Sequence, residues 1–132
     1  MGGELILIIE DNALNLKLVR DVLDHEGYRT IAAVTAEAGL ALATAELPDL
    51  ILMDVQLPAM DGISALAELR AQQRTAAIPV MVLTAFAMDK DRERFNAAGF
   101  NGYLEKPVDV RELRTQVRAM LGSRSGAGQN GR

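Results

Sequence analysis

Five polar side chains that could act together in chemistry follow short apolar segments of the sequence, each at the point where a segment ends. They are three carboxylates, one hydroxyl and one ammonium: Glu10, Asp11, Asp54, Thr84 and Lys106. If the apolar segments form parallel strands, their carboxyl ends meet at one edge of the sheet and bring these side chains together. Carboxylates about 5 Å apart repel one another by about 3 kcal/mol per pair at an effective dielectric constant of about 20. Three of them therefore need a cation or a proton nearby.

The types of donor at this edge favour a hard divalent cation. The chain has no cysteine and a single, remote histidine, His25, so the donors are oxygens, which suit Mg²⁺ or Mn²⁺ better than zinc. A divalent ion, a lysine and a hydroxyl around a carboxylate also match what a transferring phosphoryl group requires, because that chemistry depends on positioning and charge neutralisation. Asp54 is then the candidate nucleophile, and a turn through Pro58 and Gly62 leaves its oxygen open at the rim.

Each of these residues has an ordinary structural explanation when it is considered alone. An aspartate after a strand is most often a helix N-cap, a threonine is usually a satisfied hydroxyl, and a lysine is usually a solvated charge. All five at consecutive strand ends are improbable under those explanations. The combination therefore favours a functional site.

The surrounding pattern predicts strands that alternate with helices. Apolar segments rich in Ile, Val and Leu predict strands over residues 5–9, 28–33, 50–53, 80–83 and 102–105. Helical spacing predicts a first helix that buries Leu16, Val19 and Leu23 before a stop at Gly27, and further helices over 36–47, 62–72 and 89–98. A final helix starts with a capping-box spacing at Asp109 and lays Val110, Leu113, Val117 and Met120 on one face. Strands this apolar, alternating with helices, predict a doubly wound, flavodoxin-like α/β parallel sheet with helices on both faces.

Composition and charge fit one globular domain. The 132 residues are 49% hydrophobic and 24% charged, with a net charge of −4 and a pI near 5.0. This balance argues against nucleic acid or an anionic membrane as a partner. No apolar run approaches the ~18 residues that span a bilayer, and the first residues do not resemble a signal peptide. We therefore expect a cytoplasmic protein whose fold depends on packing, without disulfides.

The end of the sequence predicts a region apart from the domain. We expect one domain over residues 1–121 and a disordered tail over residues 122–132, because GSRSGAGQNGR is polar and rich in glycine. Gly126, Gly128 and Gly131 match G-x-G-x-x-G. A dinucleotide site needs a strand before this pattern and a helix after it, so the match carries no weight.

Four motifs together resemble the receiver domains of two-component response regulators. They are IIEDN at residues 8–12, DLILMDVQLPAMDG at 49–62, PVMVLTA at 79–85 and GYLEKP at 102–107. The resemblance covers residues 5–121 and implies five strands in the order 2-1-3-4-5. Among receivers, EDNALNLKLVRDVL and LTAFAM are most similar to single-domain regulators of the DivK type. Receivers of hybrid histidine kinases share DN-x-x-N and DRER-x-x-x-AG, so a domain excised from such a kinase stays an alternative.

The resemblance implies a role for each residue of the cluster. Asp54 would accept a phosphoryl group from a histidine kinase or a histidine phosphotransfer protein, and Thr84 and Lys106 would bind the phosphoryl oxygens. Mg²⁺ would be held by Asp11, Asp54 and the backbone carbonyl of Gln56. Glu10 stands where many members have a second aspartate, and it would reach the metal directly or through water. The bond between Lys106 and Pro107 would be cis, as in relatives.

The resemblance also implies two surfaces that contact other proteins. Tyr103 would turn inward as the Thr84 hydroxyl moves, although an aromatic there could also simply cover the sheet edge. An output surface on the fourth predicted helix, the last strand and the final helix would bind a downstream target, and we expect it to include Phe95, Tyr103, Arg111, Arg114 and Arg118. A docking patch of Leu14, Asn15 and Leu18 would receive the four-helix bundle of a kinase or phosphotransfer partner.

Two functions from other classes compete with a signalling switch. A metal-dependent phosphatase with an aspartyl nucleophile would also use Asp54, but phosphatases similar to haloacid dehalogenases place a second aspartate two residues later, where this chain has Gln56. We therefore expect no turnover beyond the chain's own phosphorylation and dephosphorylation. A pseudo-receiver used only for assembly would not need Asp54, Thr84 and Lys106 together.

Overall fold

The computed structural model describes residues 3–57, 60–85 and 89–128. Its centre is one parallel sheet in the order β2-β1-β3-β4-β5, as predicted. The strands are β1 (Leu5–Ile9), β2 (Arg29–Ala33), β3 (Leu50–Asp54), β4 (Val80–Thr84) and β5 (Gly102–Glu105). β3 and β4 are each one residue longer than expected, so Asp54 and Thr84 belong to the strands themselves. This matters for the site, because strand geometry fixes the backbone of both residues.

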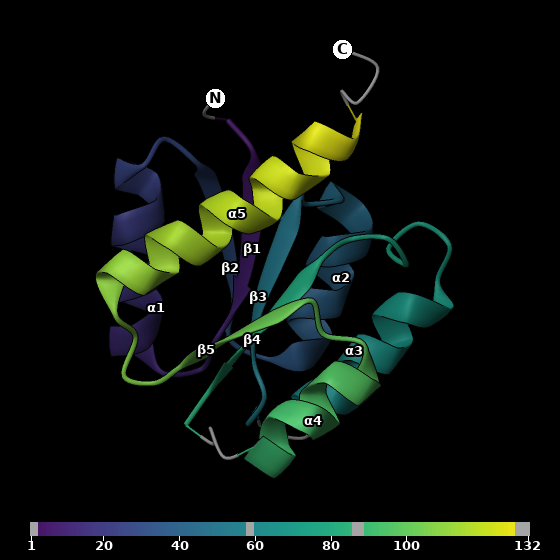
Figure 1. The fold of residues 1–132 in the computed structure, drawn as a ribbon. Helices are drawn as coiled ribbons and strands as arrows, with labels where there is room; N and C mark the ends of the chain where they lie inside the picture. The colour runs from purple at the N-terminus through teal and green to yellow at the C-terminus, as the bar shows by residue number, and fades with distance from the viewer. Residues whose placement is uncertain (1–2, 58–59, 86–88, 129–132) are drawn as a thin grey trace.

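Helices cover both faces of the sheet (Figure 1). They are α1 (Ala13–His25), α2 (Ala36–Glu46), α3 (Gly62–Ala71), α4 (Asp89–Ala98) and α5 (Val110–Gly128). α1 and α5 pack on one face around Ile6 and Ile8, whereas α2, α3 and α4 pack on the other around Leu7 and Ile9. Consecutive residues of β1 thus face opposite layers, which explains why its sequence is apolar without alternation.

Local signals in the sequence explain where the helices start and stop. The side chains of Asn12, Thr35 and Asp61 each accept a hydrogen bond from a backbone N–H in the first turn of α1, α2 and α3. Gly27 and Gly99 follow α1 and α4 at φ angles of 92° and 106°, a region that favours glycine. The chain therefore turns back toward the sheet directly after both helices.

The final helix differs from the prediction at both ends. Val110 is 36% exposed, so it lies in the first turn of α5 without joining the buried face of Leu113 and Val117. At the other end, α5 continues to Gly128, past the expected domain end at Leu121. Glycine weakens a helix by only about 1 kcal/mol, and no proline stops this one. The rest of the expected tail, residues 129–132, lies outside the described residues, as does Pro58 of the expected turn.

Candidate functional site

Lys106 joins two carboxylates at the carboxyl edge of the sheet. Its Nζ lies 2.8 Å from Asp54 Oδ2 and 2.8 Å from Glu10 Oε1. The contact with Asp54 has hydrogen-bond geometry, whereas the contact with Glu10 is an ion pair by distance, and Oε1 accepts no well-directed hydrogen bond. The ammonium from the loop after β5 thus bridges two carboxylates, one at the end of β3 and one directly after β1.

Asp54 is held in a fixed orientation. It ends β3, and its Oδ1 accepts the N–H of Gln56 at 2.8 Å while Oδ2 accepts Lys106. The loop after β3 is drawn close to α3, because Gly62 N–H donates to the Val55 carbonyl at 2.9 Å. A Cβ on Gly62 would lie 2.9 Å from Val55 Cα, so glycine permits this close return. The carboxylate is therefore positioned before any ligand arrives.

Glu10 is the most deeply covered member of the cluster. Its side chain is buried, and its Oε2 accepts the N–H of Asn12 at 3.0 Å. Burial raises the pKa of Glu10 and the nearby Asp54 adds to this, although Lys106 and the Asn12 N–H oppose the rise. For Lys106, burial alone would lower the pKa, but hydrogen bonds and charge from Asp54 and Glu10 outweigh it and raise the pKa. The ammonium therefore stays protonated around neutral pH.

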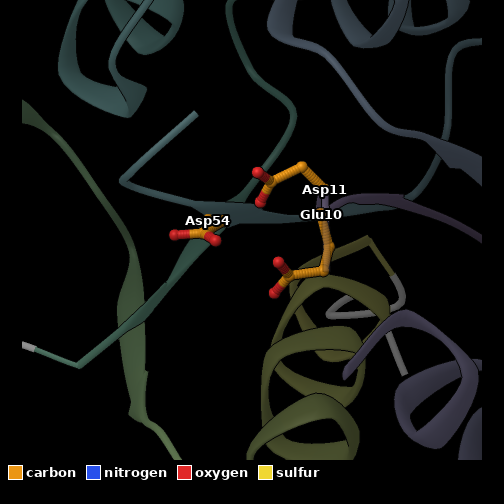
Figure 2. A group of neighbouring side chains, drawn as sticks. All are labelled: Glu10, Asp11 and Asp54. Atoms are coloured by element: carbon orange, nitrogen blue, oxygen red, sulfur yellow. The ribbon is translucent and has the colours of Figure 1, made fainter. Parts of the chain in front are cut away.

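Three carboxylates surround a space that could hold a metal ion. Oxygens of Glu10, Asp11 and Asp54 lie within 4.8 Å of one another, and Asp11 is exposed while the other two are buried. Figure 2 shows Glu10 and Asp11 extending in opposite directions from the end of β1, with Asp54 across from both. All donors are oxygens and one lysine offsets only one of three negative charges, so the residues fit Mg²⁺ or Mn²⁺.

Thr84 lies beside the cluster, in the neighbouring strand. Asp54 pairs with Leu83 in the β3–β4 register, which places Thr84 one residue further along. Thr84 is buried, and its carbonyl accepts the Lys106 N–H at 2.7 Å. The bond between Lys106 and Pro107 is cis, as predicted. The structure thus brings all five predicted residues to one edge of the sheet.

Two aromatic residues of the predicted output surface have different surroundings. Tyr103 is partly exposed, and the Arg92 guanidinium carbon lies 4.6 Å from its ring centroid. Phe95 is only 1% exposed and meets Phe100 edge to face at 5.9 Å. Its place on the output surface was therefore wrong. α4 is otherwise strongly polar, DKDRERFNAA, and its one large apolar side chain anchors the helix to the core.

The arginines of the predicted output surface do not all face the same way. Arg118 lies 3.2 Å and Arg114 lies 4.0 Å from the carboxylate of Glu26, which is the C-cap residue of α1. Both therefore contact the end of α1, whereas Tyr103 contacts α4 through Arg92. Their part in an output surface stays a prediction. Arg111 is exposed. Glu26 could not be identified from the sequence, because its partner Arg118 lies 92 residues away along the chain.

The docking patch at the start of α1 is partly exposed. Leu14 is 80% exposed, whereas Asn15 and Leu18 are half-buried. Asn15 also donates its N–H to the capping side chain of Asn12 at 2.9 Å. Leu14 is thus the large apolar side chain most available to a partner on this helix, since Leu16 packs against the core.

Sequence reasoning missed two residues that contact the site or the predicted switch. Asn12 supplies the N–H that orients Glu10, and it follows the carboxylates directly in the IIEDN motif, which was a usable signal. Arg92 covers the Tyr103 ring. No spacing in the sequence indicated this contact, because it joins α4 to a separate strand.

Comparison with known proteins gives a consistent result. A family model described as the response regulator receiver domain matches residues 6–118. The polar-differentiation response regulator DivK of Brucella ovis is 40% identical over 117 residues, which cover 89% of this chain and 95% of that protein. The receiver domain of sensor histidine kinase PA1611 from Pseudomonas aeruginosa PAO1 is 37% identical to this chain, with a TM-score of 0.84. The match covers 92% of this chain and 99% of that one, and the PA1611 structure has a magnesium ion coordinated in the active site cleft. A CheY-like receiver domain protein from Methanospirillum hungatei JF-1 has a TM-score of 0.86 at 28% identity and covers 96% and 99% of the two chains.

The helices were also compared with the dimensions of a bilayer. None within the described part of the chain is both long enough and apolar enough to cross one.

Proposed function

This chain belongs to the family of response regulator receiver domains, and we propose that it is a phosphorylation switch in which Asp54 accepts a phosphoryl group from a phosphohistidine. The donor would be a histidine kinase or a histidine phosphotransfer protein in the cytoplasm. The observation that carries the proposal is the position of Lys106 Nζ, 2.8 Å from Asp54 Oδ2 within a cluster of three carboxylates. That arrangement supplies a nucleophile, a fixed cation and ligands for a second cation in one place.

The transfer exchanges one bond to phosphorus for another. A carboxylate oxygen of Asp54 attacks phosphorus, the bond from phosphorus to the imidazole nitrogen breaks, and that nitrogen keeps the electron pair and takes up a proton. The product is an acyl phosphate on Asp54. Water attacking the same phosphorus later returns the carboxylate and releases inorganic phosphate, so the switch resets without another substrate.

Magnesium would be held by Asp11, Asp54 and the Gln56 carbonyl, with Glu10 acting directly or through water. When bound, the ion offsets negative charge on the phosphoryl oxygens as phosphorus changes partners. Asp11 is the exposed member of the cluster and is open to an incoming ion. Glu10 is held by Lys106 and by the Asn12 N–H, which keeps its carboxylate near Asp54.

Phosphorylation would change the partners of Lys106 and Thr84. The resting ammonium is paired with an Asp54 oxygen, and that charge moves to the phosphoryl group after transfer. Two hydrogen bonds to a charged group contribute about 3 to 6 kcal/mol, and moving a two-state equilibrium from 1:99 to 99:1 takes about 5.5 kcal/mol. The upper part of the first range reaches that value, so contacts from Lys106 and the Thr84 hydroxyl would drive Tyr103 inward with little surplus. The α4–β5–α5 face would then bind a downstream protein.

The partner that delivers the phosphoryl group would dock on α1. Leu14 is strongly exposed beside the site and, with Asn15 and Leu18, offers a small apolar patch to a helical bundle. Changing Leu14 and Leu18 together to alanine should slow transfer from the cognate kinase while labelling by a small phosphodonor stays unchanged. Equal transfer rates for the double variant and the wild type would show that this patch is not the docking site.

The relatives support a stand-alone regulator and leave one second candidate. The DivK relative is matched over 95% of its length, which supports a single-domain role. The PA1611 relative is the receiver of a sensor histidine kinase, so a receiver that acts within a hybrid kinase is the second candidate. Both use the same chemistry at Asp54. Purifying the chain's natural form and measuring its mass distinguishes them.

Incubation with Mg²⁺ and acetyl phosphate tests the proposed chemistry. We expect intact mass to show one added phosphoryl group, base-labile and acid-stable, that is absent from Asp54→Asn and from samples with excess chelator. A phosphatase would instead release product continuously from added phosphate esters. Labelling that persists in Asp54→Asn, or no labelling of the wild type, would contradict the proposal.

A further inference from the structure

An arginine on α4 covers the ring of the proposed switch residue. The Arg92 guanidinium carbon lies 4.6 Å from the Tyr103 ring centroid, within the range of a cation–π interaction. Arg92 itself is exposed to solvent. The contact joins α4 to β5, the two elements whose shared surface would change on phosphorylation.

The Tyr103 ring lies between the core and this arginine. Tyr103 pairs with Val82 in the β4–β5 register, and Thr84 follows two residues later on β4. The ring is partly buried against the cluster that contains Phe95, and Arg92 lies over one of its faces. A ring that turned toward Thr84 would leave the guanidinium, unless the cation followed it out of water at a large desolvation cost.

We propose that Arg92 is a positioning residue that holds Tyr103 in its surface-facing position and so sets how readily phosphorylation switches the α4–β5–α5 face. This inference rests on the proposed function of Tyr103 as the switch. It adds a residue that acts on the resting state alone, because the contact is lost once the ring turns inward.

The expected size of the effect follows from the exposure of the pair. A cation–π contact at an exposed site changes an equilibrium between two ring positions by about two- to fivefold. Because the two sites are thermodynamically linked, a ligand that favours the inward ring binds more tightly by the same factor once the restraint is removed. Beryllofluoride with Mg²⁺, which imitates a phosphoryl group on aspartate, is such a ligand.

The chain offers a matched control on the same helix. Arg94 lies 5.3 Å from the ring centroid of Phe95, a core ring that is not the proposed switch residue. Arg94→Ala removes the same charge and the same type of contact as Arg92→Ala. Any effect of net charge alone therefore appears in both variants, and an effect on the switch appears only in Arg92→Ala.

Ring signals of Tyr103 can be observed without overlap. The chain has two tyrosines and no tryptophan, so ¹³C-tyrosine labelling of a Tyr28→Phe background reports on Tyr103 alone. Ring shifts would be recorded at rest and across a titration with beryllofluoride and Mg²⁺ for the background protein, Arg92→Ala, Arg92→Lys and Arg94→Ala. The same series in a Tyr103→Leu protein, followed by amide shifts near Asp54, gives the second measurement.

We expect Arg92→Ala to move the resting Tyr103 signal toward its ligand-bound position and to tighten beryllofluoride binding about two- to fivefold, with Arg94→Ala unchanged and Arg92→Lys in between. In the Tyr103→Leu protein, Arg92→Ala should leave the affinity for beryllofluoride unchanged. Equal affinities for Arg92→Ala and Arg94→Ala would overturn the inference while the proposed function stands. A background protein whose Tyr103 signal ignores beryllofluoride although Asp54 binds it would overturn both the inference and the switch role of Tyr103.

Discussion

Two partly buried cations lie at opposite ends of the same sheet, and their surroundings differ in charge. At the carboxyl edge, Lys106 contacts the carboxylates of Asp54 and Glu10. At the amino edge, the Arg70 guanidinium donates to neutral oxygens: the carbonyls of Ala76, Ile78 and Gly99 and the side-chain oxygen of Asn101. The pKa of Lys106 is raised by its carboxylate partners against the effect of burial, whereas burial lowers the pKa of Arg70.

The difference indicates that the surroundings of Lys106 suit a ligand, whereas the surroundings of Arg70 stabilise the fold. Around Arg70, one cation satisfies several carbonyls that precede β4 and β5, and the directional fork of arginine suits such a task. Lys106 contacts two carboxylates, and the third, that of Asp11, lies within 4.8 Å of them, which leaves two negative charges unbalanced when all are ionised. That surplus equals the charge of a divalent ion. We therefore expect the amino edge to respond to mutation through stability, and the carboxyl edge to respond through ligand binding.

Removing Arg70 should cost the most stability. Arg70→Met removes the donor to the partly buried carbonyls of Ala76 and Ile78, and we expect the free energy of unfolding to fall by about 2 to 4 kcal/mol. Urea denaturation measures this, with or without Mg²⁺. Arg74→Met is the control, because Arg74 donates to one exposed carbonyl and should change stability by less than about 0.5 kcal/mol. Equal losses of stability in Arg70→Met and Arg74→Met would contradict a special role of Arg70 in the fold.

Removing Lys106 should give a smaller loss that depends on metal. Lys106→Met leaves the carboxylates of Glu10 and Asp54 without their cation, and we expect the free energy of unfolding to fall by about 1 to 2 kcal/mol in the presence of a chelator. Saturating Mg²⁺ should restore much of this stability, because it binds only the folded site. The difference in stability between Arg70→Met and wild type should be the same with and without Mg²⁺, because both proteins keep the whole carboxylate cluster. A Lys106→Met loss that Mg²⁺ leaves unchanged would mean that the carboxylates do not share a cation.

The smallest effect concerns the pH dependence of stability. Burial raises the pKa of Glu10 above its ordinary value of 4.5, so the folded state holds this proton at pH values where the unfolded chain has lost it. Its stabilising contribution is complete below about pH 4.5 and is lost as the pH rises through the raised pKa. In metal-free buffer, wild type should therefore gain stability relative to Glu10→Gln as the pH falls through that window. For Arg70→Met, the difference from wild type should not vary over the same range, because arginine does not titrate there.

The sequence predicts those parts of the molecule that depend on the spacing of apolar residues and on the polar residues at strand ends. Strand ends are marked by the change from apolar to polar residues, and parallel strands share an edge, so Asp54, Thr84 and Lys106 could be grouped before any coordinates existed. The DRERF segment also indicated that Phe95 is buried, since a polar helix needs its one large apolar residue in the core. The resemblance to other receivers suggested a surface position for Phe95, and the polar pattern of the helix was the better guide.

Other features were not accessible, because their partners are backbone atoms or distant side chains. The oxygens around Arg70 are mostly carbonyls, which every residue carries and which no sequence pattern distinguishes. The pairing of Arg114 and Arg118 with Glu26 depends on how α5 crosses α1. The contact of Arg92 with Tyr103 likewise depends on the packing of α4 against β5. Side-chain pairing between separate elements is therefore where the structure adds most.

A Mg²⁺ titration followed by amide chemical shifts across the whole chain tests the central claim most directly, because it observes both edges of the sheet at once. We expect saturable shifts at residues 10–12, 54–56 and 106, and none beyond the background at residues 76–78 and 99–101 around Arg70. Asp11→Asn should reduce the Mg²⁺-dependent shifts at residues 10–12, 54–56 and 106. Shifts that fail to saturate at residues 10–12 and 54–56, or that are as large around Arg70, would contradict a cation site at the carboxyl edge.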